Sequence, residues 1–211
     1  MVKVKLIKID KADLLYANCF VVTDSKKQCV VVDPTAIDNT IVDYIEDNGL
    51  TLKGILLTHG HCDHVRGVDV LYKKYKVPVF IGGYDIYKLR DSHINCSEFL
   101  GECCYVLSPA VTISDNDVLN DLIDEEIIVI DTPYHTSGSV CYYFKNSNIL
   151  FSGDFILPHG VGRCDLPSSI PEELPISMAK IKALPKTCKI YGGHGGSSTL
   201  EIELRLNPFV K

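Results

Sequence analysis

The chain lacks the features of a membrane, exported or nucleic-acid-binding protein. No apolar run approaches the ~20 residues of a membrane-spanning helix, and lysine and aspartate interrupt the N-terminal residues where an export signal would be apolar. The net charge is −6 and the basic residues are dispersed, so the basic stripe of a nucleic-acid surface is missing. We therefore expect a cytoplasmic protein that binds neither membranes nor nucleic acids.

The sequence also lacks a Cys-x-x-Cys pair and a Gly-x-Ser-x-Gly nucleophile elbow, which argues against a zinc ribbon and against a serine hydrolase of that type. Its nine cysteines are an odd number, so we expect reduced thiols rather than disulfides. Cys19, Cys29, Cys141 and Cys188 stand in apolar contexts typical of buried strand positions. Cys62 differs because it lies inside a histidine-rich loop, where it could be a redox-sensitive residue; we interpret it as a filler.

What is present indicates a mixed α and β domain. The 211 residues are 46% hydrophobic, which suits one compact domain over residues 1–211. Apolar periodicity predicts helices over 37–48, 64–75, within 171–184, and over 198–206. It predicts strands over 2–9, 16–23, 29–32, 52–57, 77–81, 103–107, 111–113, 126–131, 140–144, 148–152 and 189–191.

A loop that follows one of these strands concentrates possible metal ligands. Residues 58–64 read Thr-His-Gly-His-Cys-Asp-His and come directly after the apolar run 54–57. His59 and His61 are two residues apart and point the same way on an extended backbone, whereas Asp63 and His64 must point elsewhere. Imidazole and carboxylate are suitable ligands for Zn²⁺ or Fe²⁺, so the loop can serve two adjacent metal positions.

This loop resembles the His-x-His-x-Asp-His signature of the metallo-β-lactamase fold superfamily. Three later segments resemble its further metal-binding stations, in order: 132–139 with His135, 151–154 with Asp154, and 192–195 with His194. The resemblance implies an α/β (α+β) fold, a four-layer αββα sandwich of two mixed β-sheets with helices outside.

The same resemblance implies a binuclear metal site. The first ion would be bound by His59, His61 and His135, the second by Asp63, His64 and His194, and both by Asp154. A shared carboxylate offsets the repulsion between two cations ~3.5–4 Å apart. We leave His93 and His159 unassigned; His159 could line the substrate mouth, and we treat it as a surface residue.

Other segments resemble the glyoxalase II-like hydrolases, in particular their small, single-domain members. Residues 161–165 resemble the Gly-Arg-x-Asp segment of these hydrolases and of the related persulfide dioxygenases, in which Arg163 and Asp165 would form a structural ion pair near the site. The closing segments 199–203 and 207–209 also match. Tyr134 and Glu201 replace usual glycines, and the sequence ends about 17 residues after His194, so we do not expect the helical domain that helps full-length glyoxalase II to hold glutathione.

The resemblance implies hydrolysis of an acyl-glutathione-type thioester by a metal-bound hydroxide, with Asp63 orienting the nucleophile. The cofactors would be two divalent ions, Zn²⁺ first, with Fe²⁺ or Mn²⁺ as alternatives. The partner would be a small-molecule thioester; residues 84–120, the final loops and Tyr134 would shape its pocket. Natural substrate, substrate-binding residues and oligomeric state stay open.

The main alternative is a persulfide dioxygenase of the same fold, with one Fe²⁺ on His59, His135 and Asp154. Hydrolases of other esters or lactones, β-lactamases and a tRNA-processing nuclease rank lower. A non-catalytic binding or scaffold protein on this fold would have lost ligands, and none of the seven is missing.

Overall fold

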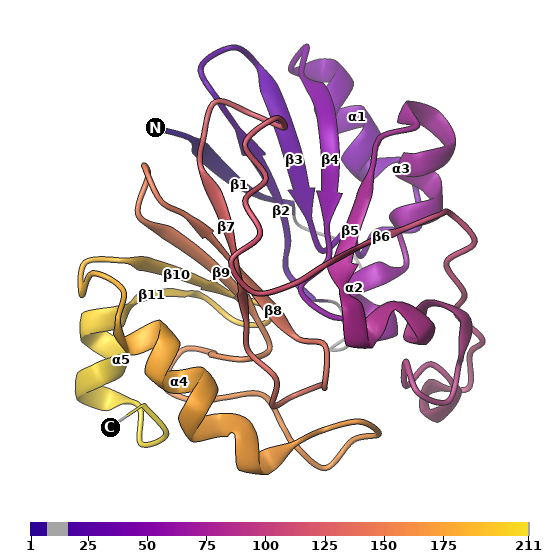
Figure 1. Ribbon diagram of the computed structural model, residues 1–211. Coiled ribbons are helices and arrows are strands. Elements are labelled where there is room, and N and C mark those ends of the chain that lie inside the picture. The colour runs from indigo at the N-terminus through magenta and orange to yellow at the C-terminus, as the bar shows by residue number, and fades with distance from the viewer. Residues whose placement is uncertain (8–16, 211) are drawn as a thin grey trace.

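The computed structural model describes residues 1–7 and 17–210, whose strands form two mixed β-sheets lying face to face (Figure 1). In spatial order the first sheet contains β1 (Lys3–Ile7), β2 (Cys19–Thr23), β3 (Gln28–Val32), β4 (Thr51–Leu56), β5 (Val79–Gly82) and β6 (Val111–Ile113). The second contains β11 (Ser197–Thr199), β10 (Lys189–Gly192), β9 (Ile149–Gly153), β8 (Val140–Phe144) and β7 (Ile127–Asp131). Both sheets combine parallel and antiparallel pairs.

The central strands are apolar on both faces because each face of the sheet is covered. In β2, Cys19 and Val21 belong to one hydrophobic cluster, whereas Phe20 and Val22 belong to the cluster between the sheets. Side chains alternate between the faces of a strand, so a strand buried on both faces is continuously apolar. The alternation of apolar residues with lysine in β1, in contrast, is typical of an edge strand.

Helices complete the four-layer αββα sandwich. The first sheet packs against α1 (Thr40–Asp47) and α3 (Val68–Tyr75), on the right in Figure 1. The second packs against α4 (Leu174–Lys182) and α5 (Leu200–Leu206), at the lower left. None of the helices in the described residues has the length and apolarity that a bilayer crossing requires.

Three local predictions differ from the structure. The helix predicted over 64–75 is two helices, α2 (Cys62–Val65) and α3, because the N–H of Gly67 between them donates to the carbonyl oxygen of Pro34 instead of continuing the helix. The strand predicted over 103–107 is absent, although residues 111–113 do form β6. The start of the last predicted helix is the strand β11 instead. Residues 8–9 and 16 of two predicted strands lie outside the described residues.

The remaining short helices are of the 3₁₀ type: η1 (Gly83–Arg90), η2 (Glu98–Leu100) and η3 (Pro171–Glu173). The sequence predicts no strand over residues 83–101, where the structure has η1 and η2. All nine cysteines are free, and the four expected to be buried hydrophobic residues are fully buried.

Candidate metal centre

Four strand ends deliver the predicted ligands to one place. In the second sheet β7, β9 and β10 run in the same direction, so their carboxyl ends lie at the same end of the sheet. They precede His135, Asp154 and His194, respectively, while β4 of the first sheet precedes the loop with His59. Since a loop at a strand end is held by the sheet behind it, side chains distant in sequence meet here.

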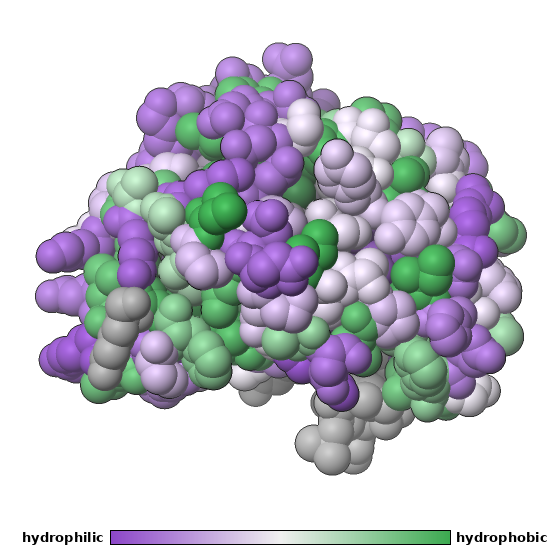
Figure 2. Space-filling view, turned by 60° about the horizontal axis from the view of Figure 1, so that its bottom comes forward, coloured by the Kyte–Doolittle hydropathy of each residue, from purple (hydrophilic) through white to green (hydrophobic). Residues whose placement is uncertain are grey.

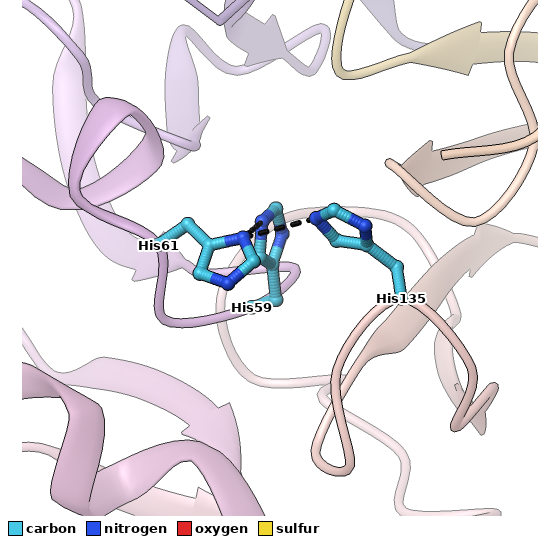
Figure 3. A group of neighbouring side chains, drawn as sticks. All are labelled: His59, His61 and His135. Atoms are coloured by element: carbon cyan, nitrogen blue, oxygen red, sulfur yellow. Dashed lines mark hydrogen bonds between the residues drawn. The ribbon is translucent and has the colours of Figure 1, made fainter. Parts of the chain in front are cut away.

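Three histidines form a first cluster, in which ring nitrogens point toward one another (Figure 3). His61 Nδ1 lies 3.1 Å from His59 Nε2 and 3.0 Å from His135 Nε2. A nitrogen carries at most one proton, so His61 Nδ1 cannot donate to both neighbours. Three buried nitrogens that converge in this way fit a cation better than they fit mutual hydrogen bonds.

The far ring nitrogens of two of these histidines have partners that fix their tautomers. His135 Nδ1 lies 2.6 Å from the backbone oxygen of Arg163 and donates to it, which leaves the Nε2 lone pair free. Thr58 Oγ1 donates its only proton to Asp33, so it accepts from His59 Nδ1 at 3.2 Å. Both rings therefore turn an unprotonated Nε2 toward the cluster.

Asp63, His64 and His194 form a second cluster, and Asp154 lies between the two. His194 Nε2 lies 3.4 Å from Asp63 Oδ2 and 3.4 Å from Asp154 Oδ2. Asp154 Oδ1 lies 3.5 Å from His64 Nε2, and its Oδ2 lies 3.6 Å from His135 Nε2. One carboxylate therefore faces ligand atoms of both clusters.

Buried polar atoms without partners show that these residues fit metal ions. His64 Nε2 and Asp154 Oδ1 are buried and have no hydrogen-bond partner. An orphaned buried polar atom is costly, and here the two atoms face each other across a gap too long for a hydrogen bond. A divalent ion between them would satisfy both.

The electrostatics favour ligand-competent protonation states for His59 and His61 of the first cluster and for Asp154. Burial, and after it the neighbouring imidazoles, hold the pKa of His59 and His61 well below the usual value, so both rings are neutral. Burial raises the pKa of Asp154, but contacts with His194 and His64 outweigh it and place that pKa well below its usual value. Asp154 is therefore ionised despite its burial.

Two buried aspartates that the sequence motifs did not indicate support the site. Asp33, at the end of β3, accepts from Thr58 and lies 2.9 Å from His64 Nδ1. Asp85 of η1 accepts from the backbone N–H groups of Gly60 and Gly138, and from the hydroxyl of Thr136. Asp85 thus ties the loop that carries His59 and His61 to the loop that carries His135.

A signal for Asp33 was present in the sequence, because an acid directly after an apolar strand can lie at the same sheet edge as the metal loop. Asp85 had none, since its partners are 25 to 53 residues away along the chain.

The other residues that the sequence singled out lie on the surface or in the hydrophobic core. Arg163 and Asp165 form a two-pronged ion pair of 2.6 and 2.7 Å on the surface. His93 and His159 are exposed and pair with Glu98 and Glu203. Tyr134, which we expected to shape the pocket, is buried against Phe155 in the outer cluster of the second sheet; that expectation was wrong.

A pocket of about 400 Å³ adjoins both clusters. The predicted metal ligands that line it are His61, Asp63, His135, Asp154 and His194. Its other walls come from residues 96–100 and 157–166, so part of the predicted segment 84–120 does shape it. Cys62 also lines the pocket, and burial raises the pKa of this thiol to about 12, which keeps it protonated.

Comparison with curated proteins gives relatives over nearly the whole chain. The protein named "Probable metallo-hydrolase YqgX" of Bacillus subtilis (strain 168) is 32% identical over 192 residues, 90% of each chain. A hydroxyacylglutathione hydrolase of Prochlorococcus marinus is 30% identical over 187 residues, which are 86% of this chain and 66% of that enzyme.

Solved structures share the fold. The BLEG-1 B3 metallo-β-lactamase superposes with a TM-score of 0.91 at 30% identity and covers 99% of both chains. TTHA1623 in a di-iron-bound form gives 0.84 at 28% identity, over 93% of this chain and 96% of that one. The family model described as "Metallo-beta-lactamase superfamily" matches residues 12–194. The chain, with its clustered histidine and carboxylate side chains, belongs to the metallo-β-lactamase superfamily.

Proposed function

We propose that the protein is a binuclear metallohydrolase that cleaves thioesters, in the manner of glyoxalase II. The observation that carries the proposal is the position of Asp154, whose two oxygens face the ligand atoms of two separate clusters. Two divalent ions would be held by His59, His61 and His135 and by Asp63, His64 and His194, with Asp154 shared. We propose Zn²⁺ as the native metal, with Fe²⁺ or Mn²⁺ as alternatives.

When bound, the ions supply a nucleophilic hydroxide at neutral pH and an electrophile for the carbonyl oxygen. The residues of the chain hold the reacting groups. Asp63 lines the pocket and, with its Oδ2 near His194 Nε2, is placed to orient the attacking oxygen as well as to bind metal. In the overall reaction the acyl carbon gains the hydroxyl group of water, the C–S bond breaks, and the sulfur leaves with the proton.

The relatives support this assignment at the level of the reaction. A hydroxyacylglutathione hydrolase is among the proteins that share at least 30% identity with the chain. The di-iron form of TTHA1623 supports a two-ion centre in a related chain and leaves the identity of the metal here as a proposal. The proposed partner is a small-molecule thioester in the cytoplasm.

The test is the release of thiol from S-lactoylglutathione by the purified protein, with and without a chelator, under air and under nitrogen. We expect release that is abolished by the chelator, restored by Zn²⁺, and equal under both gases. Oxygen uptake with glutathione persulfide, and no thiol release from thioesters by the metal-loaded protein, would contradict the proposal and support the dioxygenase with iron on His59, His135 and Asp154.

A further inference from the structure

The walls of the pocket beyond the metal ligands are mainly apolar. Phe99 and Leu100 of η2 contribute one stretch, and Leu157, Val161 and Leu166 contribute another. Phe99 is 58% exposed, so part of this wall faces solvent. On the face that is lowest in Figure 1, hydrophobic residues lie directly beside hydrophilic ones (Figure 2).

Little positive charge is available to a ligand in this pocket. Among the described residues that line it, Arg163 is the one lysine or arginine. Its Nε and Nη2 atoms already donate to the carboxylate of Asp165. The glutathione moiety of a thioester carries two carboxylates, whose burial is costly without cations or several donors. The walls are better suited to an uncharged chain, whose burial is favourable.

A buried lysine holds the two wall stretches together. Lys88 of η1 is fully buried, and its Nζ donates to the backbone oxygens of Ile94 and Pro167 and to the hydroxyl of Ser168 at 2.6 Å. It therefore links the residues just before η2 to the residues just after Leu166. Because these hydrogen bonds engage the ammonium group away from solvent, Lys88 preorganises the walls and is not free to bind an anion.

We infer that the pocket accepts the acyl chain of the substrate and selects a short to medium, uncharged, apolar chain. The inference depends on the proposed thioesterase function and adds the substrate class to it. Leu157 and Leu166 are the specificity-determining residues, since they lie in the same pocket as the ligands Asp154 and His194. Polar acyl groups such as lactoyl are poorer substrates because they leave the apolar walls in contact with water.

The experiment measures kcat/KM for thioesters of one small neutral thiol, N-acetylcysteamine, with straight acyl chains of increasing length from acetyl to octanoyl. We expect kcat/KM to rise about fourfold for each methylene that enters the pocket, the factor that burial of one methylene supplies. The rise ends when the pocket is full. The hexanoyl thioester is expected to exceed S-lactoylglutathione.

Variants test whether the apolar side chains of the pocket walls cause the dependence on chain length. Leu157→Ser and Leu166→Ser should flatten the dependence on chain length, with folding checked by circular dichroism. The matched control is Leu107→Ser, which changes a leucine that is 69% exposed and outside the pocket lining, and should retain the wild-type dependence. An acetyl thioester of hexanethiol tests which half of the thioester the pocket binds, because its apolar chain belongs to the thiol and not to the acyl group.

The outcomes are distinct. A constant kcat/KM along the acyl series, a preference for S-lactoylglutathione, or an equal gain from the hexanethiol thioester would overturn the inference and leave the thioesterase function intact. If the metal-loaded protein hydrolyses none of the thioesters, the proposed function fails, and the inference fails with it.

Discussion

Single protons and lone pairs decide whether this centre can bind metal. His64 Nε2 faces the second cluster, and Asp33 Oδ2 lies 2.9 Å from the other ring nitrogen of His64. Burial lowers the pKa of His64, but Asp63 and Asp33 outweigh it and raise that pKa, so the metal-free ring favours the imidazolium form with a proton on each nitrogen. A cation would therefore displace the Nε2 proton, while the Nδ1 proton stays directed to Asp33.

Replacing Asp33 by asparagine tests this role at the scale of one residue. In Asp33→Asn the amide nitrogen must face either the backbone N–H of Thr58, or both the Thr58 hydroxyl and His64 Nδ1, and all three of these groups donate to Asp33. We expect metal affinity or kcat/KM to fall by about 10- to 100-fold, as for other partners of metal-bound histidines. Zinc titration and thioester hydrolysis measure the two effects.

The matched control is Asp121→Asn, the same change at an exposed carboxylate, which should alter neither quantity. An Asp33→Asn variant with wild-type zinc affinity and thioester turnover would show that Asp33 does not control the protonation of His64.

Strand ends position the centre, and one of them requires a close backbone approach. A Cβ on Gly193, just after β10, would lie 2.2 Å from Asp154 Oδ1 and 2.7 Å from His64 Cε1. Such contacts are too short, so the two ligands would have to move. Glycine at this position lets β10 deliver His194 while Asp154 and His64 keep their places.

We therefore expect Gly193→Ala to displace ligands and to lower kcat/KM by about 100-fold, the effect of a misplacement of roughly 1 Å at a reacting centre. Gly196→Ala is the control in the same loop, because a Cβ there meets nothing within 4 Å. The metal content of both purified variants should be compared. Equal metal content and turnover would contradict the idea that backbone approach shapes the centre.

The sequence predicted the elements that carry the site better than it predicted their surroundings. The strands that become β4, β7, β9 and β10 were identified because apolar runs end at ligand-bearing loops. The 3₁₀ helix η1, with Asp85 and Lys88, could not be assigned a role, because its contacts are made with residues far along the chain. Local periodicity does not encode such contacts. The same holds for Tyr134, whose packing partner Phe155 belongs to another segment.

At the scale of the whole molecule, the centre lies where the two sheets meet. The loop after β4 comes from the first sheet, and His135, Asp154 and His194 come from the second. Metal ions bound there would connect both halves of the sandwich, so binding should favour the folded state. For one site with free metal at 1,000 times Kd, the free energy of unfolding would increase by about 4 kcal/mol.

The most direct measurement is a calorimetric zinc titration of the metal-free protein, with thioester hydrolysis followed in parallel. We expect binding to saturate at two ions per chain, activity to reach its maximum only with the second ion, and the melting temperature to rise. The control, Asp154→Ala, should lose tight binding at both positions because it removes the shared carboxylate. Saturation at one ion with full activity, or a fully metallated and active Asp154→Ala variant, would contradict the two-metal hydrolase.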